Sequence, residues 1–175
     1  MSEAGNIVDA DIVDDAAHGR RSDGGIYLAI ASESEEGQKA LRYAARMAQA
    51  HRGHLGIVHV LHVDDFQHWS NVEEMMKQEL RAEAEKFIWT LAKTMHELTD
   101  HIPVLYIEEG QRDDVLVDII NDDPAIRMLV LGGGTGGAGP GPLVSHFTGK
   151  GLSRLRVPVV VVPGHLEPQK IDAIV

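Results

Sequence analysis

The sequence predicts an α/β fold in which five parallel strands form one sheet with helices on both faces. Five short apolar runs have the length and the β-branched composition of strands that are buried on both sides. Segments with the apolar period of a helix lie between these runs. Because strands and helices alternate along the chain, each crossover is expected to be a helix and the sheet to be parallel. The expected strands are 26–31, 55–61, 102–107, 128–131 and 157–162.

The first strand (26–31, IYLAIA) is followed at once by a helix start signal. Ser32 and Glu35 have the three-residue spacing of a capping box, so we predict a helix that begins here. Small and apolar residues recur on one face of this helix through Arg52, and Gly53 is expected to end it.

The second strand (55–61, LGIVHVL) contains one of two closely spaced histidines. His59 and His62 are three residues apart, so a strand directs them to opposite faces, and we predict no metal site there. Residues 64–71 are expected to form a loop and residues 72–98 the longest helix. The core-facing stripe of that helix is Val72, Met76, Leu80, Phe87, Leu91, Met95 and Leu98.

The third strand (102–107, IPVLYI) carries Pro103 near its start, which predicts a position at the edge of the sheet. A short amphipathic helix is expected over 113–121. After the fourth strand and a glycine-rich loop, a last helix over 144–155, weakened by two internal glycines, leads to the fifth strand (157–162).

Right-handed crossovers leave few ways to arrange these strands, and we predict the order 3-2-1-4-5. In such sheets ligands bind beyond the carboxyl ends of the strands, at the point where the strand order reverses. The first and fourth strands flank that point. Ser32 and the loop that begins at Gly132 are therefore expected to face each other across one crevice.

Length and composition predict one ordinary globular domain with two tails. The 175 residues divide into an acidic leader (1–23), expected to be mostly disordered, a domain (24–163) and a C-terminal tail (164–175). The chain has no cysteine, which excludes a disulfide framework and cysteine-ligated zinc. The net charge of −11 argues against nucleic acid or a membrane surface as a partner. No apolar run is long enough to span a membrane and no secretory signal is evident, so we predict a cytoplasmic protein.

The loop after the fourth strand is the stretch most suited to bind an anion. Nine of the twenty residues from Gly132 to Gly151 are glycine, which lets backbone N–H groups turn toward a ligand. From Pro124 to Leu166 the chain has no Asp or Glu and four Lys or Arg residues. An acid-free, glycine-rich turn after a buried strand is a place where phosphate is tolerated. The alternative reading is a surface loop that lacks acids by chance.

Motifs of catalysis and of classical nucleotide binding do not fit the sequence. The loop formally matches GxGxxG, but Pro140 and Pro142 interrupt any helix that opens from it and no acid follows before Glu167. There is no P-loop and no GxSxG nucleophile elbow. We therefore predict a binding module and not an enzyme, with no metal site.

Four stretches together resemble the universal stress protein family over roughly Gly24 to Pro163. They are IYLAIASESEEGQKALRYAARMA, LGIVHVLHV, IEEGQRDDVLVDIINDD, and LVLGGG followed by a linker and VPVVVVP. The resemblance implies a Rossmann-like three-layer sandwich of the adenine nucleotide alpha hydrolase-like kind. It also implies a homodimer, often formed by antiparallel pairing of the last strands, here Val157 to Val162. Many members of the family bind ATP, and others do not.

The ATP-binding members carry an acid after the first strand, a valine in the second strand and a loop of the form G-x-x-G-(nine residues)-G-[ST]. In this sequence Val60 matches the valine and Gly132 the first glycine. Ser32 stands in the place of the acid, and a hydroxyl cannot accept from ribose or adenine as a carboxylate does. Thr135 takes the place of the second glycine.

The end of the loop motif is also altered. Ser145 stands at the third glycine and His146 at the Ser/Thr position. A shift of one residue recovers Gly133 and Gly136 but places His146 at the third glycine. The motif is therefore degraded in either register.

Two readings of this site stay open at this point. In the first, N–H groups of residues 133–137 and the hydroxyls of Thr135 and Ser145 still bind an anion, with His146 adding a charge when protonated. In the second, Ser32 and Ser145 are only helix N-caps. The candidate nucleotide- or anion-binding residues are Ser32, Val60, Gly132, Gly133, Thr135, Gly136, Ser145 and His146.

The resulting prediction is a homodimeric stress-response module in which ATP binding is weakened or lost. The crevice between the first and fourth strands stays the expected ligand site, with a nucleotide or another anion as the ligand. The alternative is a true ATP-binding universal stress protein, with ATP as its cofactor.

Overall fold

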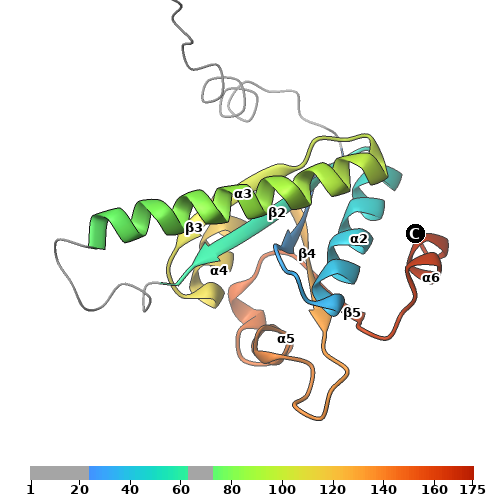
Figure 1. Cartoon of the computed structure of the whole chain (residues 1–175). Helices are drawn as coiled ribbons and strands as arrows, with labels where there is room; N and C mark the ends of the chain where they lie inside the picture. The colour runs from blue at the N-terminus through green and yellow to red at the C-terminus, as the bar shows by residue number, and fades with distance from the viewer. Residues whose placement is uncertain (1–23, 63–72) are drawn as a thin grey trace, which may run out of the picture.

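The computed structural model describes residues 24–62 and 73–175, and it contains one five-stranded sheet (Figure 1). All strand pairs are parallel and the order is β3-β2-β1-β4-β5, as the sequence predicts. The strands are β1 (Ile26–Ile30), β2 (His54–Leu61), β3 (Val104–Glu109), β4 (Ile126–Gly133) and β5 (Val159–Pro163). The expected leader 1–23 and the expected loop 64–71 lie outside the described residues.

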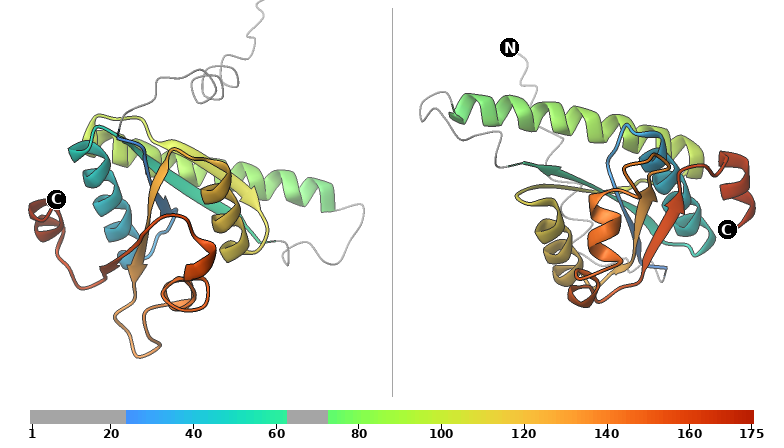
Figure 2. Two further views of the ribbon diagram at one scale, coloured as in Figure 1. Left: turned by 180° about the vertical axis from the view of Figure 1, so that it is seen from behind. Right: turned by 90° about the horizontal axis from the view of Figure 1, so that it is seen from below.

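Helices cover both faces of the sheet and create two separate apolar cores (Figure 2). On one face α2 (Glu35–Ala50) and α3 (Glu73–Thr99) pack over the sheet, with α6 (Pro168–Ala173) against α2. On the other face lie α4 (Arg112–Asp122), α5 (Pro142–Phe147) and the short 3₁₀ helix η2 (Leu152–Arg154). None of the helices in the described part of the chain is long and apolar enough to cross a membrane.

The central prediction of the topology is confirmed by the pairing of β1 with β4. Tyr27 lies opposite Met128, and Ala29 lies opposite Val130, in parallel register. Ile26 to Ala29 of β1 and Leu129 to Leu131 of β4 are buried, which explains why these stretches are continuous apolar runs. The predicted edge position of the strand after Pro103 is also confirmed, because β3 is the outermost strand beside β2.

The start of α2 differs from the predicted capping box. The N-cap is Ser34, whose hydroxyl accepts from the Gly37 N–H at 3.2 Å. Ser32 lies two residues earlier, in the turn after β1, where its hydroxyl accepts from the Ser34 N–H at 3.1 Å. The proposed N-cap role of Ser32 is therefore wrong, because a second serine stands closer to the first helical turn.

At its other end α2 stops at Ala50, before the predicted Arg52. Arg52 takes the left-handed conformation (φ 55°), and the following Gly53 N–H donates to the Ala48 carbonyl at 2.8 Å. Gly53 is needed for a different reason, since a Cβ there would overlap the carbonyl oxygen of Gly25. The sequence therefore placed the end of the helix two residues too late, and the left-handed residue is Arg52 and not the predicted stop residue Gly53.

The apolar stripe of α3 is buried only along the part of the helix that covers the sheet. Its buried residues are Ala84, Ile88, Leu91, Ala92 and Met95. Met76 was predicted to face the core but is 44% exposed, and its neighbour Met75 is 67% exposed. The first turns of α3 extend beyond the strands, so the apolar period there meets no sheet (Figure 1). The predicted stripe residue Val72 lies outside the described residues.

The predicted helix over 144–155 is wrong in extent. The chain forms α5 from Pro142 and leaves the α-helix after Phe147, and η2 follows as a separate turn. Gly151 causes the break, because its N–H returns to the His146 carbonyl at 2.9 Å and a Cβ on it would overlap the His146 ring. The helix starts early because Gly141 (φ 100°) supplies the N-cap and proline suits the first helical position.

The C-terminal tail, for which the sequence indicated no structure, forms α6 and is tied to α2. Ile171 is fully buried in the core under α2. Asp172 accepts hydrogen bonds from Arg42 and from Arg46, with Arg42 Nε at 2.8 Å and Arg46 Nε at 3.0 Å. These bonds, first those of Arg42, hold the pKa of Asp172 well below its usual range.

Replacing Asp172 by Asn is expected to lower the free energy of unfolding by about 1 kcal/mol at pH 7, because the partly exposed ion pairs are lost. Because the pKa of Asp172 is lower in the folded than in the unfolded protein, the ionised carboxylate stabilises the fold at pH values above the unfolded-state pKa. This contribution is lost as the pH falls through the folded-state pKa. Urea unfolding should therefore show a difference between the two proteins that is full at pH 6 and shrinks below about pH 4. Asp118→Asn, an exposed change on α4, is the control. A difference that does not change with pH would contradict this account.

Candidate functional site

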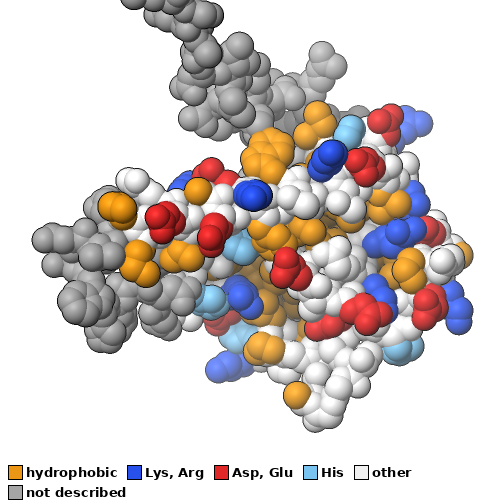
Figure 3. Space-filling view, in the orientation of Figure 1, with side chains coloured by type: hydrophobic (Ala, Val, Ile, Leu, Met, Phe, Trp, Pro, Cys, Tyr) orange, Lys and Arg blue, Asp and Glu red, His pale blue; other side chains and the backbone are white. Residues whose placement is uncertain are grey.

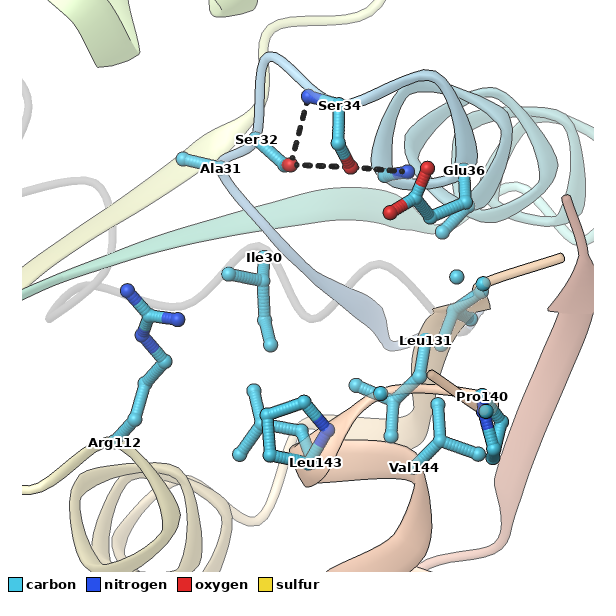
Figure 4. A pocket seen from close by; sticks show the side chains of 18 of the residues that line it. Ile30, Ala31, Ser32, Ser34, Glu36, Arg112, Leu131, Pro140, Leu143 and Val144 are labelled. Carbon is cyan, nitrogen blue, oxygen red and sulfur yellow. Dashed lines mark hydrogen bonds between the residues drawn. The ribbon is translucent and has the colours of Figure 1, made fainter. Parts of the chain in front are cut away.

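A pocket of about 510 Å³ opens at the carboxyl ends of β1 and β4 (Figure 4). Its floor consists of the last residues of these strands, and the glycine-rich loop after β4 forms one wall together with the start of α5. The turn after β1 and the first turn of α2 form the opposite wall. The volume lies in the range of small-molecule sites. This is the crevice that the strand order predicts.

Five of the eight candidate residues line this pocket: Ser32, Val60, Gly132, Thr135 and Gly136. They come from three separate elements. Ser32 follows β1, Val60 is a buried residue of β2, and the other three belong to the end of β4 and its loop. Parallel pairing of the strands brings them to one edge of the sheet.

The other three candidate residues are not among those that line it. Gly133 belongs to the sheet, and its carbonyl accepts from the Gly164 N–H at 2.9 Å. Ser145 lies exposed on α5 and is not the N-cap, which is Gly141, so this predicted capping role is wrong. His146 turns toward α4, with its Nε2 3.6 Å from the Asp113 carboxylate.

The loop uses some of its own N–H groups. The Gly134 N–H donates to the Pro140 carbonyl at 3.1 Å, and the Gly139 N–H donates to the Gly136 carbonyl at 3.1 Å. These bonds close the loop on itself, with Gly139 in a left-handed conformation (φ 87°). Two glycine N–H donors of the loop between β4 and α5 are thus occupied before any ligand arrives.

The Ser32 hydroxyl is likewise already hydrogen-bonded within the protein. It lies 3.0 Å from the Ser34 hydroxyl and accepts from the Ser34 N–H (Figure 4). A Cβ on Gly37 would overlap the Ser32 side chain, so the first turn of α2 packs directly against this serine. The position is therefore part of the turn that starts α2, as well as part of the pocket wall.

The structure adds two charged residues that sequence reasoning missed. Arg112 begins α4, just after the carboxyl end of β3, and Glu36 lies in the first turn of α2. The rule that parallel strands end at the same edge could have pointed to Arg112, because it follows the third strand closely. No motif marks Glu36, which reads as an ordinary first-turn acid.

His59 also lines the pocket, at the end nearest Arg112. Its ring packs edge-on against Phe87 of α3, with centroids 5.6 Å apart. Burial, and after it the charge of Arg112, lowers the pKa of His59. The histidine is therefore neutral at pH 7, and Arg112 supplies the positive charge at this end. Within residues 24–62 and 73–175 no three His, Asp or Glu side chains gather as a metal site requires.

The profile of the universal stress protein family matches residues 26–163, which is most of the chain. The chain belongs to the universal stress protein family. No protein with a curated description matches it in sequence.

Solved structures show the same fold as this universal stress protein. The universal stress protein UspA from Lactobacillus plantarum is 20% identical, with a TM-score of 0.60, covering 79% of this chain and 97% of that one. The hypothetical protein MJ0577 is 17% identical, with a TM-score of 0.65, covering 80% and 96%. A member of the family from Burkholderia pseudomallei is 17% identical, with a TM-score of 0.59, covering 83% and 99%.

Gly132→Ala is expected to destabilise the fold, because a Cβ at this position would overlap the Glu36 carbonyl in the first turn of α2. The backbone would have to separate, which costs about 1–3 kcal/mol of unfolding free energy in a packed site. Gly136→Ala is the matched control, since nothing lies within 4 Å of a Cβ there. Urea unfolding of both variants measures the difference. Equal stabilities would show that the approach of β4 to α2 is looser than described.

Proposed function

We propose that this universal stress protein is a homodimeric stress-response module whose pocket binds a nucleotide or another small anion, with affinity for ATP weakened. The observation that carries the proposal is that a backbone N–H group of the glycine loop is already hydrogen-bonded within the protein. The loop follows β4 as in an ATP site, but the Gly134 N–H donates to the Pro140 carbonyl. A triphosphate therefore finds fewer free donors than the glycine count indicates.

The other half of a nucleotide site is altered as well. Ser32 replaces a carboxylate acceptor, and its hydroxyl already accepts a bond from the backbone. Losing a charged acceptor for ribose or adenine costs about 1–3 kcal/mol, or about 5- to 150-fold in affinity. A site with a dissociation constant of about 1 μM would then have a dissociation constant of about 5–150 μM.

Apolar side chains support binding of an uncharged ring system in the same pocket. Ile30, Leu131, Leu143 and Val144 line it, from β1, β4 and α5 (Figure 4). Ligand pockets combine such an apolar lining with a few polar groups that fix orientation.

Binding without catalysis is the activity we propose. The pocket hydroxyls of Ser32 and Ser34 lie 3.0 Å from each other, and each is used to organise the start of α2. A nucleophile needs a base within hydrogen-bond reach, and the bonds of these two hydroxyls lead to each other and to backbone N–H groups.

The outer edge of β5 supports the homodimer. The Leu129 N–H donates to the Pro158 carbonyl, so the backbone groups of Val159 and Val161 alternate away from β4 and face the open edge. An unpaired β-branched edge is a template for another strand. A second copy pairing antiparallel along β5 would satisfy these groups.

Charge on the surface gives no reason to favour a nucleic acid. On the face drawn in Figure 3, Lys and Arg side chains are interspersed with Asp and Glu and do not gather into a basic patch. The net charge of −11 would repel a polyphosphate backbone.

Ser32→Asp is expected to strengthen ATP binding by about tenfold, because a carboxylate accepts more strongly than a hydroxyl from ribose or adenine donors. Isothermal titration with ATP and magnesium measures the dissociation constant, and Ser32→Asn is the matched control without charge. If the wild-type protein already binds ATP tightly and Ser32→Asp changes nothing, the protein is a true ATP-binding member. If no adenine nucleotide gives heat at millimolar concentration, the proposed ligand class is wrong.

Val161→Pro is expected to convert the dimer to a monomer, because proline removes an N–H that faces the open edge and is tolerated on edge strands. Sedimentation equilibrium at micromolar concentration measures the mass, and circular dichroism checks that the fold is kept. Val161→Thr keeps the N–H and should stay dimeric. A wild-type monomer, or a folded Val161→Pro dimer, would rule out assembly through β5.

A further inference from the structure

The pocket carries charges of opposite sign on opposite sides. Arg112 reaches in from the start of α4, and Glu36 lies on the far wall, at the start of α2 (Figure 4). Within the described residues neither side chain has a hydrogen-bond or ion-pair partner. In contrast, Lys39 bonds to Glu35 at 2.8 Å and Arg154 bonds to Asp114 at 2.8 Å, so neighbouring charges on the same helices are paired.

Glu36 stands directly against the glycine-rich loop. A Cβ on Gly132 would overlap its carbonyl, and a Cβ on Gly164 would meet both the Glu36 Cβ at 3.1 Å and the Thr135 Cγ2 at 3.3 Å. Glu36 therefore lies beside the first residues of the loop, where a family phosphate site would begin. Its charge repels an anion there, and the internal bond of the Gly134 N–H removes a donor at the same place.

Arg112 supplies a positive charge at the end of the pocket opposite Glu36. Its side chain extends from the start of α4 to the level of Ile30 at one end of the pocket in Figure 4. Arginine presents several donors in a planar fork that suits a phosphate or a carboxylate. His59, beside it, is neutral at pH 7, so Arg112 is the one positively charged side chain at this end of the pocket among the described residues. One cation matches an anion of low charge better than a triphosphate.

The space between the two charges is apolar. Ile30 and Leu143 lie between Arg112 and the loop in Figure 4, and Leu131 and Val144 continue the surface toward Glu36. A ligand that spans the pocket therefore needs an anion at one end, an uncharged ring body, and hydrogen-bond donors at the other end. A carboxylate accepts such donors from an amino group or from hydroxyls.

We propose that the pocket takes a nucleoside monophosphate with its phosphate at Arg112 and its base or ribose donors at Glu36. The anion thus lies at the end away from the glycine loop. Glu36 supplies the acceptor that Ser32 no longer provides. This inference rests on the proposed function, because it specifies the ligand and the polarity of that same site.

The test is isothermal titration of the full chain with AMP, adenosine and ATP. Arg112→Ala is expected to weaken AMP binding by at least about tenfold, because a charged hydrogen-bond donor is lost, and to leave adenosine binding unchanged. Arg112→Lys should retain part of the AMP affinity, since it keeps the charge but loses the fork. Arg81→Ala on α3, an exposed arginine that pairs with Glu85, is the matched control.

Glu36→Gln tests the other end. It is expected to weaken AMP binding, because an amide accepts less strongly than a carboxylate, and to strengthen ATP binding, because the repulsion at the loop is removed. A thermal melt of each variant verifies folding before titration.

The outcomes separate the two proposals. If AMP binds and Arg112→Ala lowers AMP and adenosine affinity equally or not at all, the inference is wrong and the proposed function stands. If Glu36→Gln weakens ATP and AMP binding equally, the assigned polarity is also wrong. If neither AMP nor ATP binds at millimolar concentration, the proposed function itself fails.

Discussion

The close approach of β4 to the first turn of α2 is the constraint on which the pocket depends. Gly132 has no side chain, so the Glu36 carbonyl can lie against the end of the strand. Together with the parallel pairing of β1 and β4, this approach brings the turn after β1, the start of α2 and the loop after β4 to one place. The same contact decides the chemistry of the pocket, because it places the Glu36 side chain next to the loop.

Long elements with a strong apolar period could be predicted from the sequence, since burial on a sheet determines their pattern. The strand order followed from handedness once the alternation was clear. The predicted stripe of α3 was wrong at Met76 because a period in the sequence does not say how far the sheet extends beneath a helix. The helix over 144–155 was wrong because Gly151 accommodates the His146 ring, a contact between residues that local propensity does not describe.

The candidate site could be predicted in position but not in its charges. Ser32, Val60 and the loop glycines were found because they end strands or match a motif. Arg112 and Glu36 were missed because each is a helix-start residue of a type that the helix dipole and solvent exposure explain equally well. The proposed binding roles of Arg112 and Glu36 depend on their positions on opposite sides of an apolar pocket. The sequence does not reveal these positions, because the two residues are far apart along the chain. His146 was included by motif position, yet its ring lies 3.6 Å from the Asp113 carboxylate of α4 and does not line the pocket.

The edge of β5 and the wall of the pocket depend on the same turn. Gly164, directly after β5, donates to the Gly133 carbonyl at 2.9 Å, and its own carbonyl accepts from the buried amino group of Lys39 at 2.5 Å. A side chain at Gly164 would contact Glu36 and Thr135, both of which line the pocket. The residues that follow form α6, which Asp172 fastens to α2 through Arg42 and Arg46. The tail that the sequence left unassigned therefore holds in place the helix whose first turn supplies one wall of the pocket and its negative charge.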